Sequence, residues 1–232
     1  MKKGHSDQFF NFLNILDTSG VRYTIIRGFG KFPKTPDTDV DLLYHIDDHE
    51  KYISLAKENL KEFVSANGSE WQSFGSGEWC EMLYSPCKTI GDLDPEIENG
   101  CFRIDSYNSL YFKSPYHNFS TYWTVSRDFN DFVISNRVKI VGEFGSYYIP
   151  EPACEIALLV ARNVLDNKKR PAWSTKHISR IQDLIQSDQI KREDLSDRIS
   201  QLFPNSKKIV ELIYKNSFRE IMQYALGMVR WA

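Results

Sequence analysis

Residues 23–44 read YTIIRGFGKFPKTPDTDVDLLY, and this stretch decides the fold. Residues 21–26 are rich in β-branched and aromatic side chains, which predicts a strand. A segment with two glycines and two prolines follows over residues 28–37 and is typical of a turn. Residues 38–44 then predict a second strand with two distinct faces. The stretch is therefore expected to form two strands joined by a glycine-bearing turn.

Two carboxylates lie two positions apart within the second strand. Because side chains at i and i+2 of a strand point to the same face, Asp39 and Asp41 project together. Two like charges at that separation repel each other unless a cation lies between them. Val40, Leu42 and Leu43 make the strand otherwise apolar, which favours a functional pair over two solvated surface carboxylates. Mg²⁺, which takes carboxylates and substrate phosphates as ligands, is the natural partner.

The rest of the chain divides into a mixed part and a helical part. Helices are expected to begin at residues 6–7 and 47–48, and the pattern from 70 to 149 indicates strands and turns. The expected later strands are 71–74, 79–84, 101–106 and 138–141. The first expected C-terminal helix begins at residue 151, and three more are expected over 173–186, 191–202 and 206–231. We predict an α+β fold, with a mixed twisted sheet flanked by helices in residues 1–150 and a helical domain in residues 151–232.

Composition excludes several classes of protein. The chain has 232 residues, of which 41% are hydrophobic and 26% charged, as in ordinary globular proteins. No run approaches the roughly 18 apolar residues that span a membrane, and no apolar signal core follows Met1. The four cysteines contain no C-x2-C pair, so a structural zinc site is not expected. A cytoplasmic protein is the default expectation.

The near-neutral net charge of −2 combines two parts of opposite sign. Residues 1–150 have a net charge of −6, and residues 151–232 have a net charge of +4. A protein that coats long nucleic acids would usually be strongly basic. An acidic part that holds metal ions and a basic part that holds phosphates would explain the asymmetry.

The pattern of residues 28–42, G-F-x9-D-V-D-L, resembles that of the nucleotidyltransferase superfamily typified by DNA polymerase beta. The wider stretch is similar to small bacterial nucleotidyltransferases. The resemblance implies that Asp39 and Asp41 bridge two Mg²⁺ ions, with Mn²⁺ as an alternative. It departs from the family at Phe29, where the family has Ser or Gly. Backbone N–H groups around Gly28, Phe29 and Gly30 would then bind the phosphate in place of a hydroxyl.

The family has a third carboxylate on a later strand beside the first two. The best match in this chain is Asp105, which would bind the ion nearest the acceptor hydroxyl and accept its proton. Asp92 and Asp94 compete but lie in a turn-like segment, and Glu81 is a weaker rival in a strand. An ordinary exposed strand carboxylate is the alternative for Asp105.

The resemblance also implies cations that contact the triphosphate from the helical part. Such a basic cluster closes the first C-terminal helix, although cations near a helix C-terminus are also favourable when simply solvated. The candidates are Lys168, Lys169 and Lys176, together with Arg27, Lys31 and Lys34 near the glycine turn.

We therefore expect a Mg²⁺-dependent enzyme that moves an NMP from an NTP such as ATP to a hydroxyl group and releases pyrophosphate. The acceptor would be a small molecule, a sugar or a protein. One alternative is a toxin-type transferase that acts on tRNA or a protein, with the basic C-terminal part facing the RNA. Another is a non-catalytic nucleotide-binding module of the same fold, which Phe29 favours.

Overall fold

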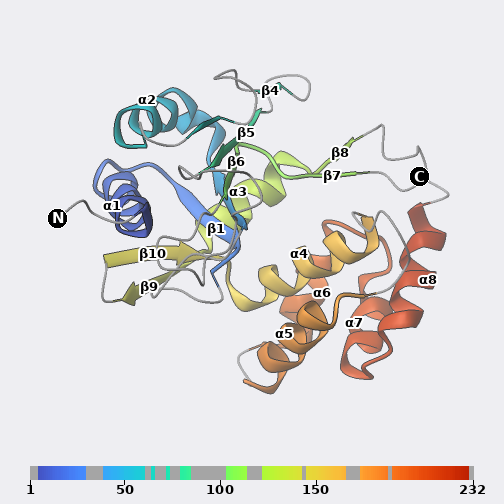
Figure 1. The fold of residues 1–232 in the computed structure, drawn as a ribbon. Helices are drawn as coiled ribbons and strands as arrows, with labels where there is room; N and C mark the ends of the chain where they lie inside the picture. Colours follow the sequence, from blue (N-terminus) through green and yellow to red (C-terminus); the bar gives the residue numbers. More distant parts are fainter. Residues whose placement is uncertain are drawn as a thin grey trace. The chain divides into compact units, whose positions relative to one another are not determined.

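A computed structural model describes residues 5–29, 39–60, 64–65, 72–73, 79–84, 103–113, 122–142, 145–165, 173–187 and 190–229 (Figure 1). The chain folds into two compact units. The first comprises Met1–Leu110 and Asn130–Pro150, and the second comprises Tyr111–Phe129 and Glu151–Ala232. Residues 111–129 therefore lie with the C-terminal helices, although they precede residue 150 in the chain.

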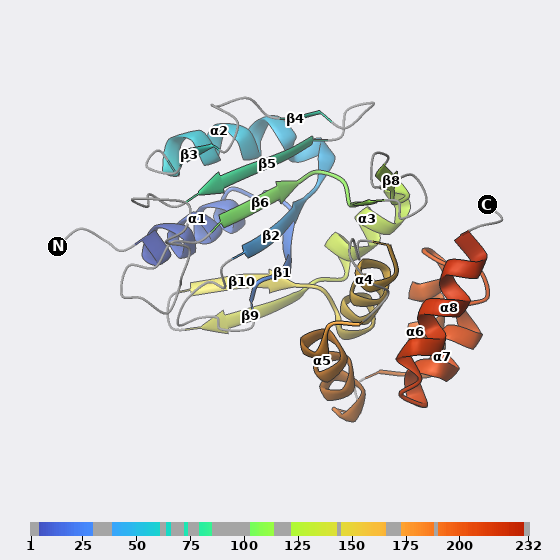
Figure 2. The same cartoon turned by 45° about the vertical axis from the view of Figure 1, so that its right-hand side comes forward.

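The first unit is built on a mixed sheet. Its strands run in the order β1 (Tyr23–Arg27), β2 (Asp39–Tyr44), β6 (Arg103–Tyr107), β5 (Trp79–Tyr84) and β3 (Val64–Ser65), and β4 (Gln72–Ser73) pairs with β5. β2 and β6 are parallel, and the other described pairs of this sheet are antiparallel. Figure 2 shows the central strands side by side. The expected mixed sheet is confirmed.

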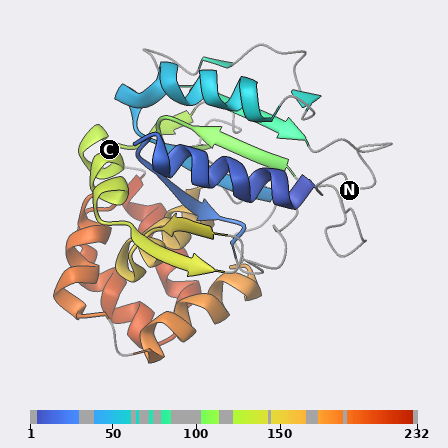
Figure 3. The ribbon, with the colours of Figure 1, turned by 90° about the vertical axis from the view of Figure 1, so that its left-hand side faces the viewer.

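Two helices cover one face of this sheet. α1 (His5–Thr18) and α2 (His49–Asn59) lie side by side against it, and the short 3-10 helix η1 (Ile46–Asp48) precedes α2 (Figure 3). The sheet residues in their shared core include Ile25, Leu42 and Ile104, all fully buried. Because side chains alternate along a strand, the residues between these apolar ones face away from α1 and α2. Asp41 and Asp105 therefore lie on the face that these helices do not cover.

A β-hairpin is tied to α1 by one carboxylate. β9 (Val138–Gly142) and β10 (Gly145–Ile149) are antiparallel, and β10 contacts both α1 and β1. Asp17, near the end of α1, accepts hydrogen bonds from Lys139 Nζ and the Tyr148 hydroxyl, each at 2.7 Å. It also accepts a longer hydrogen bond from the Ser146 hydroxyl at 3.3 Å. Because all three donors belong to the hairpin, Asp17 holds the hairpin against α1.

The Asp17 contact predicts a pH-dependent stability. Burial opposes the charged form, but the hydrogen bonds from Lys139 and Tyr148 lower the pKa of Asp17 below its ordinary value. The stabilisation is complete above the unfolded pKa of about 3.9 and is lost as the pH falls through the lower folded pKa. We expect Asp17→Asn to reduce the free energy of unfolding by about 1 kcal/mol at neutral pH and to have little effect in acid. Urea unfolding at both pH values checks this, and an equal loss at both would contradict it.

The second unit is mainly helical. Its central helix is α4 (Pro152–Leu165), which is buried along most of its length. α5 (Thr175–Gln186), α6 (Arg192–Ser200) and α8 (Phe218–Val229) pack against α4, and α7 (Ser206–Tyr214) packs against α6 and α8. The hairpin of β7 (Tyr111–Lys113) and β8 (Tyr122–Thr124) belongs to the same unit, and β7 contacts α4. No helix among the described residues is both long and apolar enough to cross a membrane.

Two helical features differ from the expectation. α3 (Arg127–Ser135) lies where strands and turns were expected, and the Ser126 hydroxyl accepts a hydrogen bond from the N–H of Phe129 in its first turn.

The C-terminal segment 206–231 was expected to be one helix but is broken between α7 and α8. Asn216 has a φ of 56°, and the N–H of Ser217 donates to the carbonyl of Leu212 at 2.9 Å. This is a Schellman ending, in which the left-handed residue stops the helix.

Candidate active site on the sheet

Two acidic side chains lie opposite each other at the centre of the sheet. Asp41 of β2 and Asp105 of β6 are direct partners in the parallel register. Neighbouring strands are about 4.8 Å apart, and paired residues point to the same face. Both residues are buried, with exposed fractions of 1% and 5% respectively. The fold thus brings together two residues from distant parts of the chain that the sequence had proposed for one site.

The third proposed carboxylate belongs to Asp39. Asp39 lies two residues before Asp41 on β2 and pairs with Arg103 of β6. Its side chain is outside the part of the structure that is described, so its role in a shared site stays a prediction.

The rivals for the third carboxylate have different positions. Glu81 of β5 pairs with Ser106, not with Asp105. Ser106 faces α2, because its hydroxyl lies 2.7 Å from the Tyr52 hydroxyl. The residue of β5 that pairs with Asp105 is Met82, so Glu81 is not the register partner of Asp105. Asp92 and Asp94 lie outside the described residues.

The carboxylate of Asp41 is contacted by a hydroxyl and a guanidinium. The Tyr107 hydroxyl donates a hydrogen bond to Asp41 Oδ1 at 3.0 Å, and Arg27 forms an ion pair with Asp41 Oδ2. Removing one partner of a buried ion pair typically costs several kcal/mol, because the remaining charge is left uncompensated. Arg27 and Tyr107 together compensate the charge of a carboxylate that water hardly reaches.

A β-bulge brings Arg27 to Asp41. Ile25 pairs with Leu42 in the antiparallel register of β1 and β2, but the next pair is Arg27 with Asp41. Ile26 is therefore the extra residue, whereas in an unbroken ladder it would lie opposite Asp41. Bulges often redirect side chains beside functional sites. Gly28 follows with a φ of 84°, a conformation that residues with a Cβ rarely adopt.

The donor set of this site fits a hard divalent cation. Asp41 and Asp105 present carboxylate oxygens from neighbouring positions, and oxygen ligands are those that Mg²⁺ and Mn²⁺ prefer. No group of three His, Cys, Asp or Glu side chains suited to a metal occurs among the described residues, which do not include the side chain of Asp39. Asp39, Asp41 and Asp105 are the residues that would hold such an ion.

The proposed phosphate-binding residues are described only in part. Arg27 and Gly28 lie at the end of β1, and Phe29 packs partly buried against the core shared with α1 and α2. The ring of Phe29 is thus used in packing. Lys176 lies in the first turn of α5 in the second unit. Gly30, Lys31, Lys34, Lys168 and Lys169 lie outside the described residues, so their phosphate contacts stay predictions.

The hydrogen bond of Tyr107 to Asp41 was missed in the sequence. The available signal was its spacing, because Tyr107 lies two residues after Asp105 and so shares its face of β6. Linking it to Asp41 also needs the parallel register of two strands that are more than 60 residues apart in the chain.

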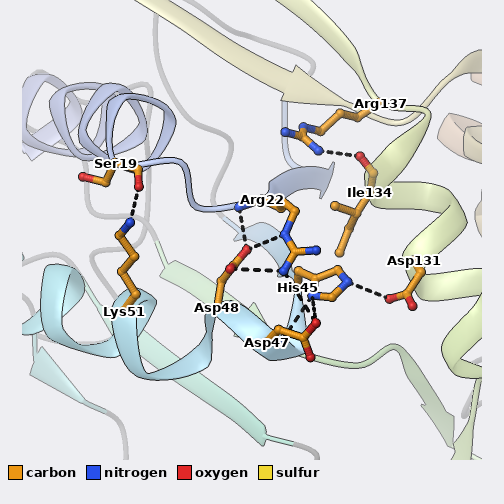
Figure 4. Close-up of polar contacts among 9 residues, drawn as sticks. All are labelled: Ser19, Arg22, His45, Asp47, Asp48, Lys51, Asp131, Ile134 and Arg137. Carbon is orange, nitrogen blue, oxygen red and sulfur yellow. Dashed lines mark hydrogen bonds and ion pairs between the residues drawn. The ribbon is translucent and has the colours of Figure 1, made fainter.

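A second polar cluster lies beyond the C-terminal end of β2 (Figure 4). The Arg22 guanidinium binds Asp48 through Nε at 2.8 Å, and the Arg22 N–H donates to the same carboxylate at 2.9 Å. His45 is buried, its Nε2 lies 3.1 Å from Asp131 of α3, and its Nδ1 accepts the N–H of Asp47. These contacts join the ends of β1 and β2 to α2 and α3, which is a structural role.

The chain is similar to known proteins in structure but not in sequence. No family model matches the chain, and no curated protein sequence is similar to it. The lincosamide antibiotic adenylyltransferase LnuA, solved with lincomycin bound, is 11% identical with a TM-score of 0.39, and the match covers 77% of this chain and 94% of that one.

Two further solved structures are similar over most of the chain. An antigenic nucleotidyltransferase-like protein from Paracoccidioides brasiliensis is 14% identical, with a TM-score of 0.46 and coverage of 97% of this chain and 93% of that one. The antibiotic-resistance factor ANT(2'')-Ia is 10% identical, with a TM-score of 0.43 and coverage of 95% and 96%. The chain is thus similar in fold to nucleotidyltransferases and a nucleotidyltransferase-like protein.

Proposed function

We propose that this protein is a divalent-cation-dependent nucleotidyltransferase that transfers an NMP from an NTP to a hydroxyl group. The observation that carries the proposal is the pairing of Asp41 with Asp105 on parallel strands, with both carboxylates buried. Two buried acidic groups side by side are costly unless cations compensate them. Gly28, which follows Arg27 directly and has a left-handed backbone, supports phosphate binding at this end of β1 because a glycine allows close approach of a ligand.

The proposed reaction is a single in-line displacement. The acceptor oxygen forms a bond to the α-phosphorus while the bond from that phosphorus to the bridging oxygen breaks, and pyrophosphate leaves. Asp105 accepts the proton of the acceptor hydroxyl, and Asp39 and Asp41 hold the metal site in place. Two bound Mg²⁺ or Mn²⁺ ions would stabilise the charge on the attacking and leaving oxygens.

The net charge of the chain indicates the chemical class of the acceptor. A net charge of −2 disfavours a long nucleic acid, which is usually bound through many basic residues. We therefore propose a small molecule, a sugar or a protein hydroxyl as the acceptor, and tRNA is the alternative that the basic C-terminal part favours.

A screen of NTPs and acceptors with pyrophosphate release as the readout tests the proposal. Each NTP is incubated with Mg²⁺ or Mn²⁺ and with pools of hydroxylated small molecules, sugars, proteins or tRNA. We expect metal-dependent pyrophosphate release with at least one acceptor pool and incorporation of the labelled NMP into that acceptor. Failure to bind any NTP in the presence of metal would contradict the proposal.

A non-catalytic nucleotide-binding module is the second candidate. The observation that favours it is the packing of Phe29 against the core at the position where the resembling family has a small or hydroxyl residue. Metal-dependent NTP binding without pyrophosphate release across the whole screen would support this candidate over the enzyme.

A further inference from the structure

We propose that Arg27 is a displaceable counter-ion of the metal site. Its guanidinium compensates Asp41 while the site is free, a divalent cation takes its place, and the released guanidinium then binds the phosphates of the nucleotide. This inference rests on the proposed function, because it assumes that Asp41 is a metal ligand. Arg27 and the metal would thus compete for the carboxylate of Asp41.

The competition follows from two contacts that differ in charge. Tyr107 donates a hydrogen bond from a neutral hydroxyl to Asp41 Oδ1, and a carboxylate oxygen can accept from a donor and bind a metal together, so this contact does not oppose a metal. Arg27 instead brings a full positive charge to Oδ2, on the carboxylate that a metal shared with Asp105 would need. Two cations on the same carboxylate repel each other. The guanidinium must therefore withdraw when the metal binds.

The two partners differ in their freedom to move. The Asp41 side chain is 1% exposed and is held within the sheet, whereas the Arg27 side chain is 27% exposed at the end of β1. The β-bulge at Ile26 and the left-handed Gly28 place Arg27 at an irregular strand end. Arg27 can thus leave Asp41 by rotating its long side chain, with no rearrangement of β2.

Displacement couples the metal to the nucleotide. A guanidinium that leaves Asp41 loses a charge-assisted contact, and a triphosphate beside the glycine turn offers it a new one. Metal binding is consequently more favourable when the nucleotide is present, and by reciprocity the nucleotide binds more tightly when the metal is present. Arg27 would in this way hold the site closed to metal until the nucleotide arrives.

Mn²⁺ binding by electron paramagnetic resonance tests the inference without any turnover. Arg27→Met removes the charge and keeps most of the apolar stem, and Arg27→Lys keeps the charge. We expect Arg27→Met to bind Mn²⁺ at least about tenfold more tightly than the wild type in the absence of nucleotide, which corresponds to about 1.4 kcal/mol. Arg27→Lys should stay close to the wild type. Equal or weaker Mn²⁺ binding by Arg27→Met would overturn the inference.

Arg22→Met is the matched control, because Arg22 also pairs with an aspartate but lies in the separate cluster beyond β2. Its Mn²⁺ affinity should equal that of the wild type. A second readout is thermal unfolding, in which Mn²⁺ should raise the Tm of Arg27→Met more than that of the wild type. If Arg27→Met does not fold, Arg27→Gln gives the same comparison.

Calorimetry with ATP tests whether the released Arg27 guanidinium binds the phosphates of the nucleotide. With Mn²⁺ at saturation, Arg27→Met should bind ATP about tenfold more weakly than the wild type in calorimetry. Unchanged ATP affinity would overturn this half.

Asp41→Asn separates failure of the inference from failure of the proposed function. If Asp41→Asn leaves Mn²⁺ binding intact, the metal site itself is wrong. If Asp41→Asn abolishes Mn²⁺ binding but Arg27→Met does not tighten it, only the role of Arg27 is wrong.

Discussion

Replacing Asp41 by Asn is expected to reduce NMP transfer at least about 10³-fold, or about 4 kcal/mol of transition-state stabilisation. Asn has nearly the same shape but lacks the charge that would hold the proposed divalent cation beside Asp105. The neighbouring Tyr107 hydroxyl still has an oxygen to contact, so the sheet should remain folded. Steady-state kinetics with pyrophosphate release as the readout measure the effect, and circular dichroism checks the fold.

Asp48→Asn is the matched control for this experiment. Asp48 is a partly buried aspartate that also pairs with an arginine, but it lies in the cluster of Figure 4. Burial opposes its charged form, while hydrogen bonds from Arg22 lower the pKa of Asp48. Its replacement should therefore cost stability and leave the rate unchanged at temperatures where the variant is folded. Equal rates for Asp41→Asn and Asp48→Asn would contradict the assignment of Asp41.

A large effect on stability is expected in the second unit. Glu155 of α4 is 5% exposed and accepts hydrogen bonds from Arg180 Nε and Nη2 at 2.7 and 2.8 Å. Arg180→Met leaves a buried carboxylate without its partner, which costs about 3–5 kcal/mol when both groups are buried. The Arg180 side chain is 42% exposed, so solvent screening reduces the expected loss to about 2–3 kcal/mol.

A double variant distinguishes this cause from lost packing. Replacing Glu155 by Leu together with Arg180→Met removes the buried charge, so most of the lost stability should return. Lys208→Met is a control, because Lys208 and Glu211 form an exposed pair whose loss should change little. Chemical denaturation followed by circular dichroism measures all three variants. Similar losses for Arg180→Met and Lys208→Met would contradict the role of burial.

The local parts of the fold were predictable from the sequence. The apolar strand that carries Asp39 and Asp41 follows from its composition and from the period of two residues. The end of α1 follows from Gly20, whose φ of 73° allows the left-handed turn after the helix. The break after α7 was missed because Asn216 supplies the same conformation with a residue that also occurs within helices.

The site depends on pairings that local sequence does not determine. The opposition of Asp41 and Asp105 requires the parallel register of β2 and β6, and a shift by one residue would put Asp105 on the other face. The contact of Arg27 with Asp41 depends on the β-bulge at Ile26. The residue types in β1 do not predict this bulge. The Asp41–Asp105 pairing was therefore expected only through the family resemblance, and the contacts of Arg27 and Tyr107 with Asp41 were not predicted.

A crystal structure with Mn²⁺ and a non-hydrolysable NTP tests the central claim most directly, because Mn²⁺ is located by its anomalous scattering. We expect an Mn²⁺ ion bound to carboxylate oxygens of both Asp41 and Asp105 at a little over 2 Å, with the Arg27 guanidinium moved from Asp41 to the phosphates. An Mn²⁺ ion bound at other residues, or a nucleotide complex in which Arg27 stays on Asp41 and no metal touches that carboxylate, would contradict it.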